Sequence, residues 1–68
     1  MYDYRRLLGK MKEQGVTQAE LAQTLGIAES SLNKKLRNCS QFKQGEMLKI
    51  MEHLSIPLSE LPSFFYAH

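Results

Sequence analysis

The fold is decided by the stretch Gln18-Ala19-Glu20-Leu21-Ala22-Gln23-Thr24-Leu25-Gly26-Ile27-Ala28-Glu29-Ser30-Ser31-Leu32. Its large apolar residues repeat at helical spacing on both sides of a glycine. Ala22 is small enough for two helices to cross closely, and Gly26 takes the left-handed turn conformation without a Cβ penalty. We therefore predict two short helices joined by a glycine turn, with the second helix lying as an external ridge.

The sequence outside this stretch has the same helical spacing, and no run alternates with period two for long enough to predict a strand. Asp3 is a candidate N-cap of a first helix, and Thr17 with Glu20 predicts a capping box at the second. Pro62 is expected to end the last helical turn. The predicted helices cover about 4–14, 17–25, 29–37 and 44–54, with a short turn at 58–61. The sequence thus predicts one all-α domain over residues 1–68.

Composition excludes several classes of function. The chain has 68 residues and one cysteine, Cys39, so no internal disulfide forms, and two distant histidines cannot complete a zinc site. No apolar run is long enough for a membrane span or a signal-peptide core. Ser30 and Ser31 lack the companions of a catalytic nucleophile. We expect a cytoplasmic protein that is not an enzyme, with no cofactor, metal, membrane contact or small-molecule substrate.

Positive charge gathers in one segment. The net charge is +2, yet residues 34–43 contain four cations and no carboxylate. These cations are Lys34, Lys35, Arg37 and Lys43. A charge run is usually a solvated face, but at the end of a predicted ridge helix it also suits the phosphates of a nucleic acid. Both interpretations stay open on charge alone.

A wider pattern resembles a known family. Leu25-Gly26-Ile27, Leu32 with Lys35-Leu36, Phe42 before the fourth helix and the terminal Phe64-Phe65 are similar to the lambda-repressor-like (Cro/C1-type) helix-turn-helix family. The resemblance is strongest to short Cro-like proteins of phages and prophages in Gram-positive bacteria. It implies a five-helix DNA-binding domain in a bacterial cell, acting as a sequence-specific transcriptional repressor. It also implies a homodimer on a pseudo-palindromic operator of double-stranded DNA.

The resemblance and the charge pattern together imply DNA contacts. The expected base-contacting residues are Ala28, Glu29, Ser30, Asn33 and Lys34, in the major groove. The expected phosphate-contacting residues are Thr17, Gln18, Lys35, Arg37, Asn38, Lys43 and Gln44. Glu29 either accepts from cytosine N4 or pairs with a neighbouring lysine, and this choice stays open. Ala28 departs from the family, which usually has a serine or threonine cap there.

The apolar tail and the external ridge each leave an alternative. The candidate dimer contact consists of Leu58, Leu61, Phe64, Phe65 and Tyr66. The same aromatic residues can instead close the core of the monomer. The rival to DNA binding is a protein–protein interaction module, antirepressor-like or antitoxin-like, on the same fold, because a fold does not determine a function.

Overall fold

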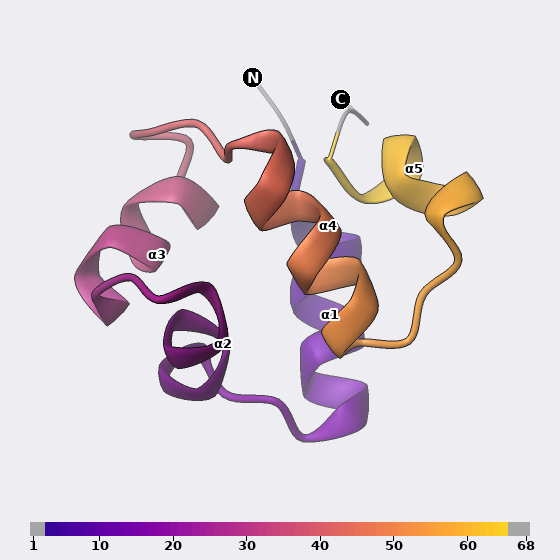
Figure 1. Cartoon of the computed structure of the whole chain (residues 1–68), viewed down its shortest axis with the longest axis horizontal. Coiled ribbons are helices and arrows are strands. Elements are labelled where there is room, and N and C mark those ends of the chain that lie inside the picture. The colour runs from indigo at the N-terminus through magenta and orange to yellow at the C-terminus, as the bar shows by residue number, and fades with distance from the viewer. Residues whose placement is uncertain (1–2, 66–68) are drawn as a thin grey trace.

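The computed structural model describes residues 3–65, and within that range the chain contains helices and no strand. The elements are α1 (Arg5–Gln14), α2 (Gln18–Leu25), α3 (Glu29–Leu36), α4 (Gln44–His53), the 3-10 turn η1 (Leu58–Glu60) and α5 (Leu61–Phe65). In Figure 1, α2 and α3 lie on one side of α4, and α5 lies on the other. The predicted all-α class and its five helices are confirmed.

Local signals set most of the helix ends. Gly15 and Gly26 both adopt φ of 71°, which ends α1 and α2 in the left-handed conformation. Thr17 Oγ1 accepts a hydrogen bond from the Glu20 N–H at 3.1 Å, as the capping-box pattern predicts. The reciprocal half of that box is wrong, because the Glu20 carboxylate lies 2.7 Å from His53 Nε2 instead. This contact ties α2 to α4.

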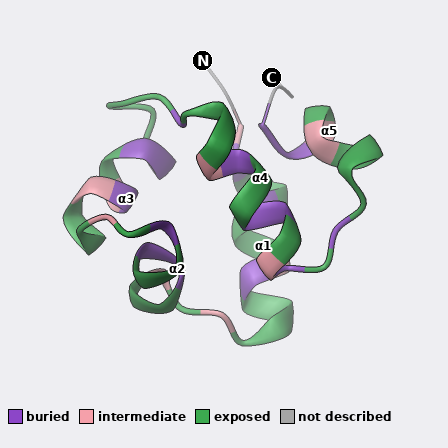
Figure 2. Cartoon of the chain, viewed as in Figure 1, coloured by how far each residue is buried: buried purple, intermediate pink, exposed green. Residues whose placement is uncertain are grey.

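The core fills the space where the helices face one another (Figure 2). Its centre is built from leucines, isoleucine and methionines of α1, α2, α3 and α4. Three aromatic rings close one end: Tyr4, Phe42 and Phe65 meet edge to face with ring centroids 5.4 to 6.2 Å apart. Such arrangements add to the stabilisation from burial alone. The two ends of the described chain are therefore fastened to each other.

The predicted dimer contact is mostly used inside the monomer. Phe65 is 1% exposed and Phe64 is also buried, while Leu61 is partly buried against the core. These residues close the protein's own core, which corrects their prediction as a dimer surface. Leu58 is 60% exposed, and Tyr66 lies outside the described residues.

The prediction that helical structure ends at Pro62 is also wrong. Pro62 is the second residue of α5, which continues to Phe65. In the first turn of a helix the backbone N–H has no intrahelical acceptor, so a proline loses nothing there. The helix then turns both terminal phenylalanines toward the core.

We expect Phe65→Ala to lower the free energy of unfolding by about 3 kcal/mol or more, because it empties a ring-sized space in the core. Urea denaturation followed by circular dichroism measures this loss of stability. We expect the loss to be the same at every protein concentration. Leu58→Ala, at an exposed position, is the control and changes stability by less than about 0.5 kcal/mol. A loss that depends on concentration contradicts the intramolecular role of Phe65.

Candidate interaction surface

An exposed face runs along α3. Leu32 and Leu36 are buried toward the core, and the residues on the outer side stay in solvent or are half-buried. We call this side the α3 face, and it consists of Glu29, Ser30, Asn33, Lys34 and Arg37. The structure therefore brings together four of the five predicted base-contacting residues, with the exposed Ala28 just before them as an N-cap without a side-chain bond. The geometry leaves these residues free to meet a partner.

Asn33 is oriented by a residue of the preceding helix. Its Nδ2 donates to Oε1 of Gln18 at 3.3 Å, and both residues are half-buried. The sequence analysis predicted that Gln18 contacts a phosphate and that Asn33 contacts a base. The structure joins them at the junction of α2 and α3, where the hydrogen bond holds the Asn33 amide in one orientation on the α3 face.

Lys35 does not belong to the exposed cations. It is 8% exposed, and its Nζ donates to the Gln41 carbonyl oxygen at 3.0 Å and lies 3.2 Å from Glu46 Oε1. Its prediction as a phosphate contact is corrected, because a buried charge must be paired and this one is paired inside the chain. The sequence feature that indicates burial of Lys35 is its position next to Leu36, on the inner side of α3.

The carboxylate of Glu46 completes this buried pair. Its Oε1 also accepts a hydrogen bond from the Lys43 backbone N–H at 2.8 Å, at the start of α4. Burial pushes the pKa of Glu46 upward, but the hydrogen bonds from Lys43 and Lys35 and their positive charges outweigh it. The pKa of Glu46 is therefore lowered. The sequence analysis did not single out Glu46.

Three cations of the run remain exposed. Within residues 3–65, no ion pair involves Lys34, Arg37 or Lys43. Lys34 and Lys43 line a hollow of about 230 Å³ between α3 and α4, together with Ser31, Ser40 and Ile27. We call this hollow the α3–α4 pocket, and Lys35 and Glu46 form the rest of its lining. Two exposed lysines and two serines thus line the same hollow.

The other residues that were predicted to contact phosphate either stabilise a helix end or are exposed to solvent. The hydroxyl oxygen of Thr17 accepts the hydrogen bond that caps α2. Asn38 adopts φ of 63° just after α3, a conformation that asparagine tolerates better than most residues, and its N–H donates to the Lys35 carbonyl oxygen. Gln44 is the exposed first residue of α4. Their contacts with phosphate stay predictions.

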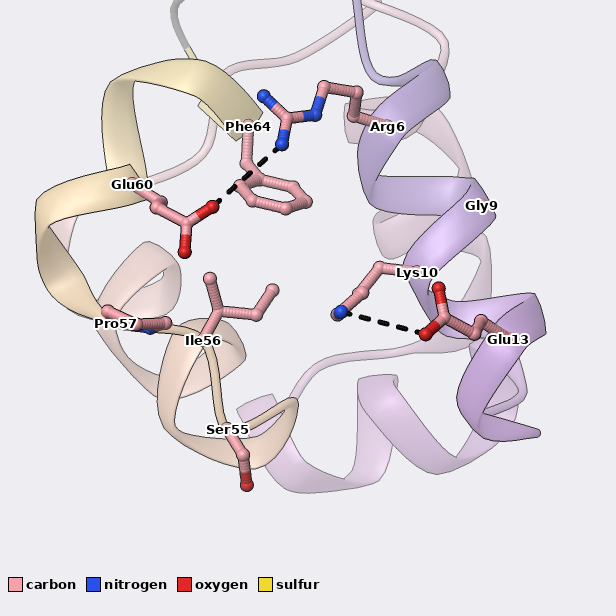
Figure 3. A pocket seen from close by; sticks show the side chains of 9 residues that line it. All are labelled: Arg6, Gly9, Lys10, Glu13, Ser55, Ile56, Pro57, Glu60 and Phe64. Carbon is pink, nitrogen blue, oxygen red and sulfur yellow. Dashed lines mark ion pairs between the residues drawn. The ribbon is translucent and has the colours of Figure 1, made fainter.

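A second hollow, of about 370 Å³, lies between α1 and the segment 55–64 (Figure 3). Arg6 lies over the ring of Phe64, 4.7 Å from its centroid, and its guanidinium is 3.8 Å from Glu60. Lys10 lies 3.8 Å from Glu13 on the other rim. Because each cation has an acidic neighbour, this hollow carries no net charge that would select a charged ligand.

Residues 3–65 were also compared with the requirements of a metal site and of a membrane span. No three side chains of His, Cys, Asp or Glu come together there as candidate metal ligands. None of its helices combines the length and the apolar character needed to cross a bilayer.

Fold and surface together define a small all-helical protein that presents one exposed helix face and a cationic pocket beside it. Over residues 1–68 the chain matches the family described as "Protein of unknown function (DUF739)", and it belongs to that family. It is similar to the solution structure of the modulator of repression (MOR) of the temperate bacteriophage TP901-1 from Lactococcus lactis. The identity is 34%, over 96% of this chain and 88% of that chain, with a TM-score of 0.77. No curated protein matches the chain.

These findings overturn the assignment to the lambda-repressor-like (Cro/C1-type) repressors and to the short Cro-like prophage proteins. Apart from Gly26, which ends α2, and Lys35, which pairs with Glu46, the residues behind that resemblance pack in or against the core. Ala22, Gly26 and the leucines around them let two short helices cross, and any protein that needs this crossing is under the same steric demand. They identify an arrangement of helices, and they carry no information about what the outer face binds.

The lowered pKa of Glu46 predicts how stability depends on pH. A carboxyl group with a lower pKa in the folded state stabilises it above the ordinary value of 4.5, and this contribution is lost as the pH falls below that value. Between about pH 5.5 and about pH 3.5, we expect the urea concentration at the midpoint of unfolding to fall in the wild type and to fall less in Glu46→Gln.

Asp3→Asn is the control for this measurement. Hydrogen bonds from Arg5 lower the pKa of Asp3 to about 2, so this exposed group also contributes to acid sensitivity, but it loses its charge at lower pH. Equal slopes for wild type and Glu46→Gln contradict the assigned role of Glu46.

Proposed function

We propose that this chain regulates repression in a phage by binding another regulatory protein through the α3 face. The carrying observation is its likeness, at 34% identity along nearly the whole chain, to a protein described as a modulator of repression. Because the likeness covers 96% of the chain, it includes the α2–α3 pair and the face it presents. On this proposal the chain acts on a repressor, and the alternative of a protein-interaction module becomes the main interpretation.

The distribution of charge on the α3 face supports a protein partner. Glu29 stands at the first turn of α3, whereas Lys34 and Arg37 stand at its end, about 8 to 12 Å further along the axis. Duplex DNA presents negative charge along its whole length, so Glu29 would repel it. A protein surface can place a cation opposite Glu29 and carboxylates opposite the two cations.

A steric block on the α3 face tests the proposal. We expect Ser30→Trp to weaken binding to the repressor of the same phage by about tenfold or more, because Ser30 lies exposed in the first turn of α3. Titration calorimetry with the two purified proteins measures the affinity. Ser59→Trp, on the exposed surface of η1, is the matched control and leaves binding unchanged. If Ser30→Trp binds as tightly as wild type, the α3 face is not the interface.

Double-stranded DNA is the second candidate partner, and it is favoured by three exposed cations that make no ion pair within residues 3–65, Lys34, Arg37 and Lys43. On that proposal the chain binds an operator as a homodimer, with Asn33 and Lys34 at base edges. Fluorescence anisotropy on a random-sequence duplex tests it between about 50 and about 200 mM salt. A linear loss of log affinity with log salt supports DNA binding. Negligible binding at the lowest salt excludes it and leaves the protein partner.

A further inference from the structure

We infer that the α3–α4 pocket takes a carboxylate side chain, Asp or Glu, from the protein partner. This inference rests on the proposed function and adds the chemistry of the partner's anchoring residue. The pocket opens beside the α3 face and shares Lys34 with it. A partner side chain that reaches Lys34 on the face therefore also reaches the edge of the pocket.

The groups that line the pocket are hydrogen-bond donors to an anion. Four lining residues carry donor groups, and they come from three segments, α3, the loop after it and the start of α4: Lys34, Lys43, Ser31 and Ser40. Each can donate to a carboxylate oxygen, and hydrogen bonds to a charged group are the stronger kind. Because they line one hollow, these residues differ from cations that are spread over a solvated surface.

The one carboxylate in the lining is already engaged. Glu46 Oε1 receives the Lys43 backbone N–H and lies 3.2 Å from Lys35 Nζ, and Lys35 is fixed in turn by the Gln41 carbonyl oxygen. The charges of Glu46 and Lys35 therefore largely cancel inside the protein. The two exposed lysines, Lys34 and Lys43, therefore leave the lining with a net positive charge, which favours an anion.

The size and surroundings favour a side chain over a phosphodiester backbone. The hollow holds about 230 Å³, and half-buried Ile27 supplies an apolar wall for the methylene groups of an Asp or Glu. A nucleic-acid backbone that continued past the pocket along α3 would meet the negative charge of Glu29. A single carboxylate on a folded partner reaches the lysines without meeting Glu29.

The test uses the full chain and the purified repressor of the same phage. We expect Lys34→Gln with Lys43→Gln to weaken repressor binding by about tenfold or more. The matched control is Lys12→Gln with Lys49→Gln, which removes the same charge at exposed positions outside the pocket and changes binding less than about twofold. Thermal unfolding checks that both double variants keep the wild-type melting temperature.

A charge swap identifies the anchoring residue. Lys34→Glu with Lys43→Glu abolishes repressor binding, and changing single acidic residues of the repressor to lysine restores it at one position. Restoration at one position supports the inference, and the absence of restoration at every acidic position overturns it.

The possible failures are distinguishable. If wild type binds the repressor and the Lys34→Gln, Lys43→Gln variant binds equally well, the inference fails and the proposed function stands. If wild type does not bind the repressor, the proposed function fails, and the inference fails with it. If the variant loses affinity for a random-sequence duplex and keeps its affinity for the repressor, the pocket holds a phosphodiester, which overturns the inference.

Discussion

The buried ammonium group of Lys35 determines how α3 sits on the rest of the protein. It reaches past the end of its own helix to the Gln41 carbonyl oxygen and the carboxylate of Glu46, so α3, the following loop and α4 meet at one charge. Buried ion pairs add little net stability, because desolvation offsets their attraction, but a broken pair is costly. The pair therefore acts mainly as a constraint on register. A rotation of α3 that moved Lys35 away would leave a carboxylate without its partner.

Much of the fold was predictable because local chemistry decides it. The helix bounds follow from Thr17, Gly15 and Gly26 and from apolar spacing, which act within one or two turns. Apart from the helix end expected at Pro62, which is a local error, the errors in the fold came from contacts between distant segments. Glu20 left its capping role for His53, 33 residues away, and Phe65 found its place against Tyr4 at the other end of the chain. Neither partner is visible from local spacing.

The candidate site divides in the same way. Helical spacing alone places the α3 face on the outside, since only Leu32 and Leu36 turn inward as large apolar residues. The charge run was harder to interpret, because a lysine that is internally paired and a lysine in solvent are identical in sequence. The structure separates them: one cation is inside, and three lie exposed around the end of α3 and the start of α4. The family assignment failed for a related reason, since most of the residues that it used serve packing and none of them lies on the α3 face.

This division of the cations changes the electrostatic argument about a partner. If all four cations of residues 34–43 were exposed, the segment would suit a long polyanion such as DNA. With Lys35 matched to Glu46, the positive charge that remains is confined to one end of α3, and Glu29 stands at the other end. A helix face with opposite charges at its two ends discriminates between partners by geometry, because only a surface with the reverse order avoids repulsion at both ends. A folded protein can present that order, whereas the phosphates of a duplex are negative along its whole length. On the proposed function, the internal pair of Lys35 and Glu46 would influence recognition through charge, because it leaves one fewer unmatched cation on the surface.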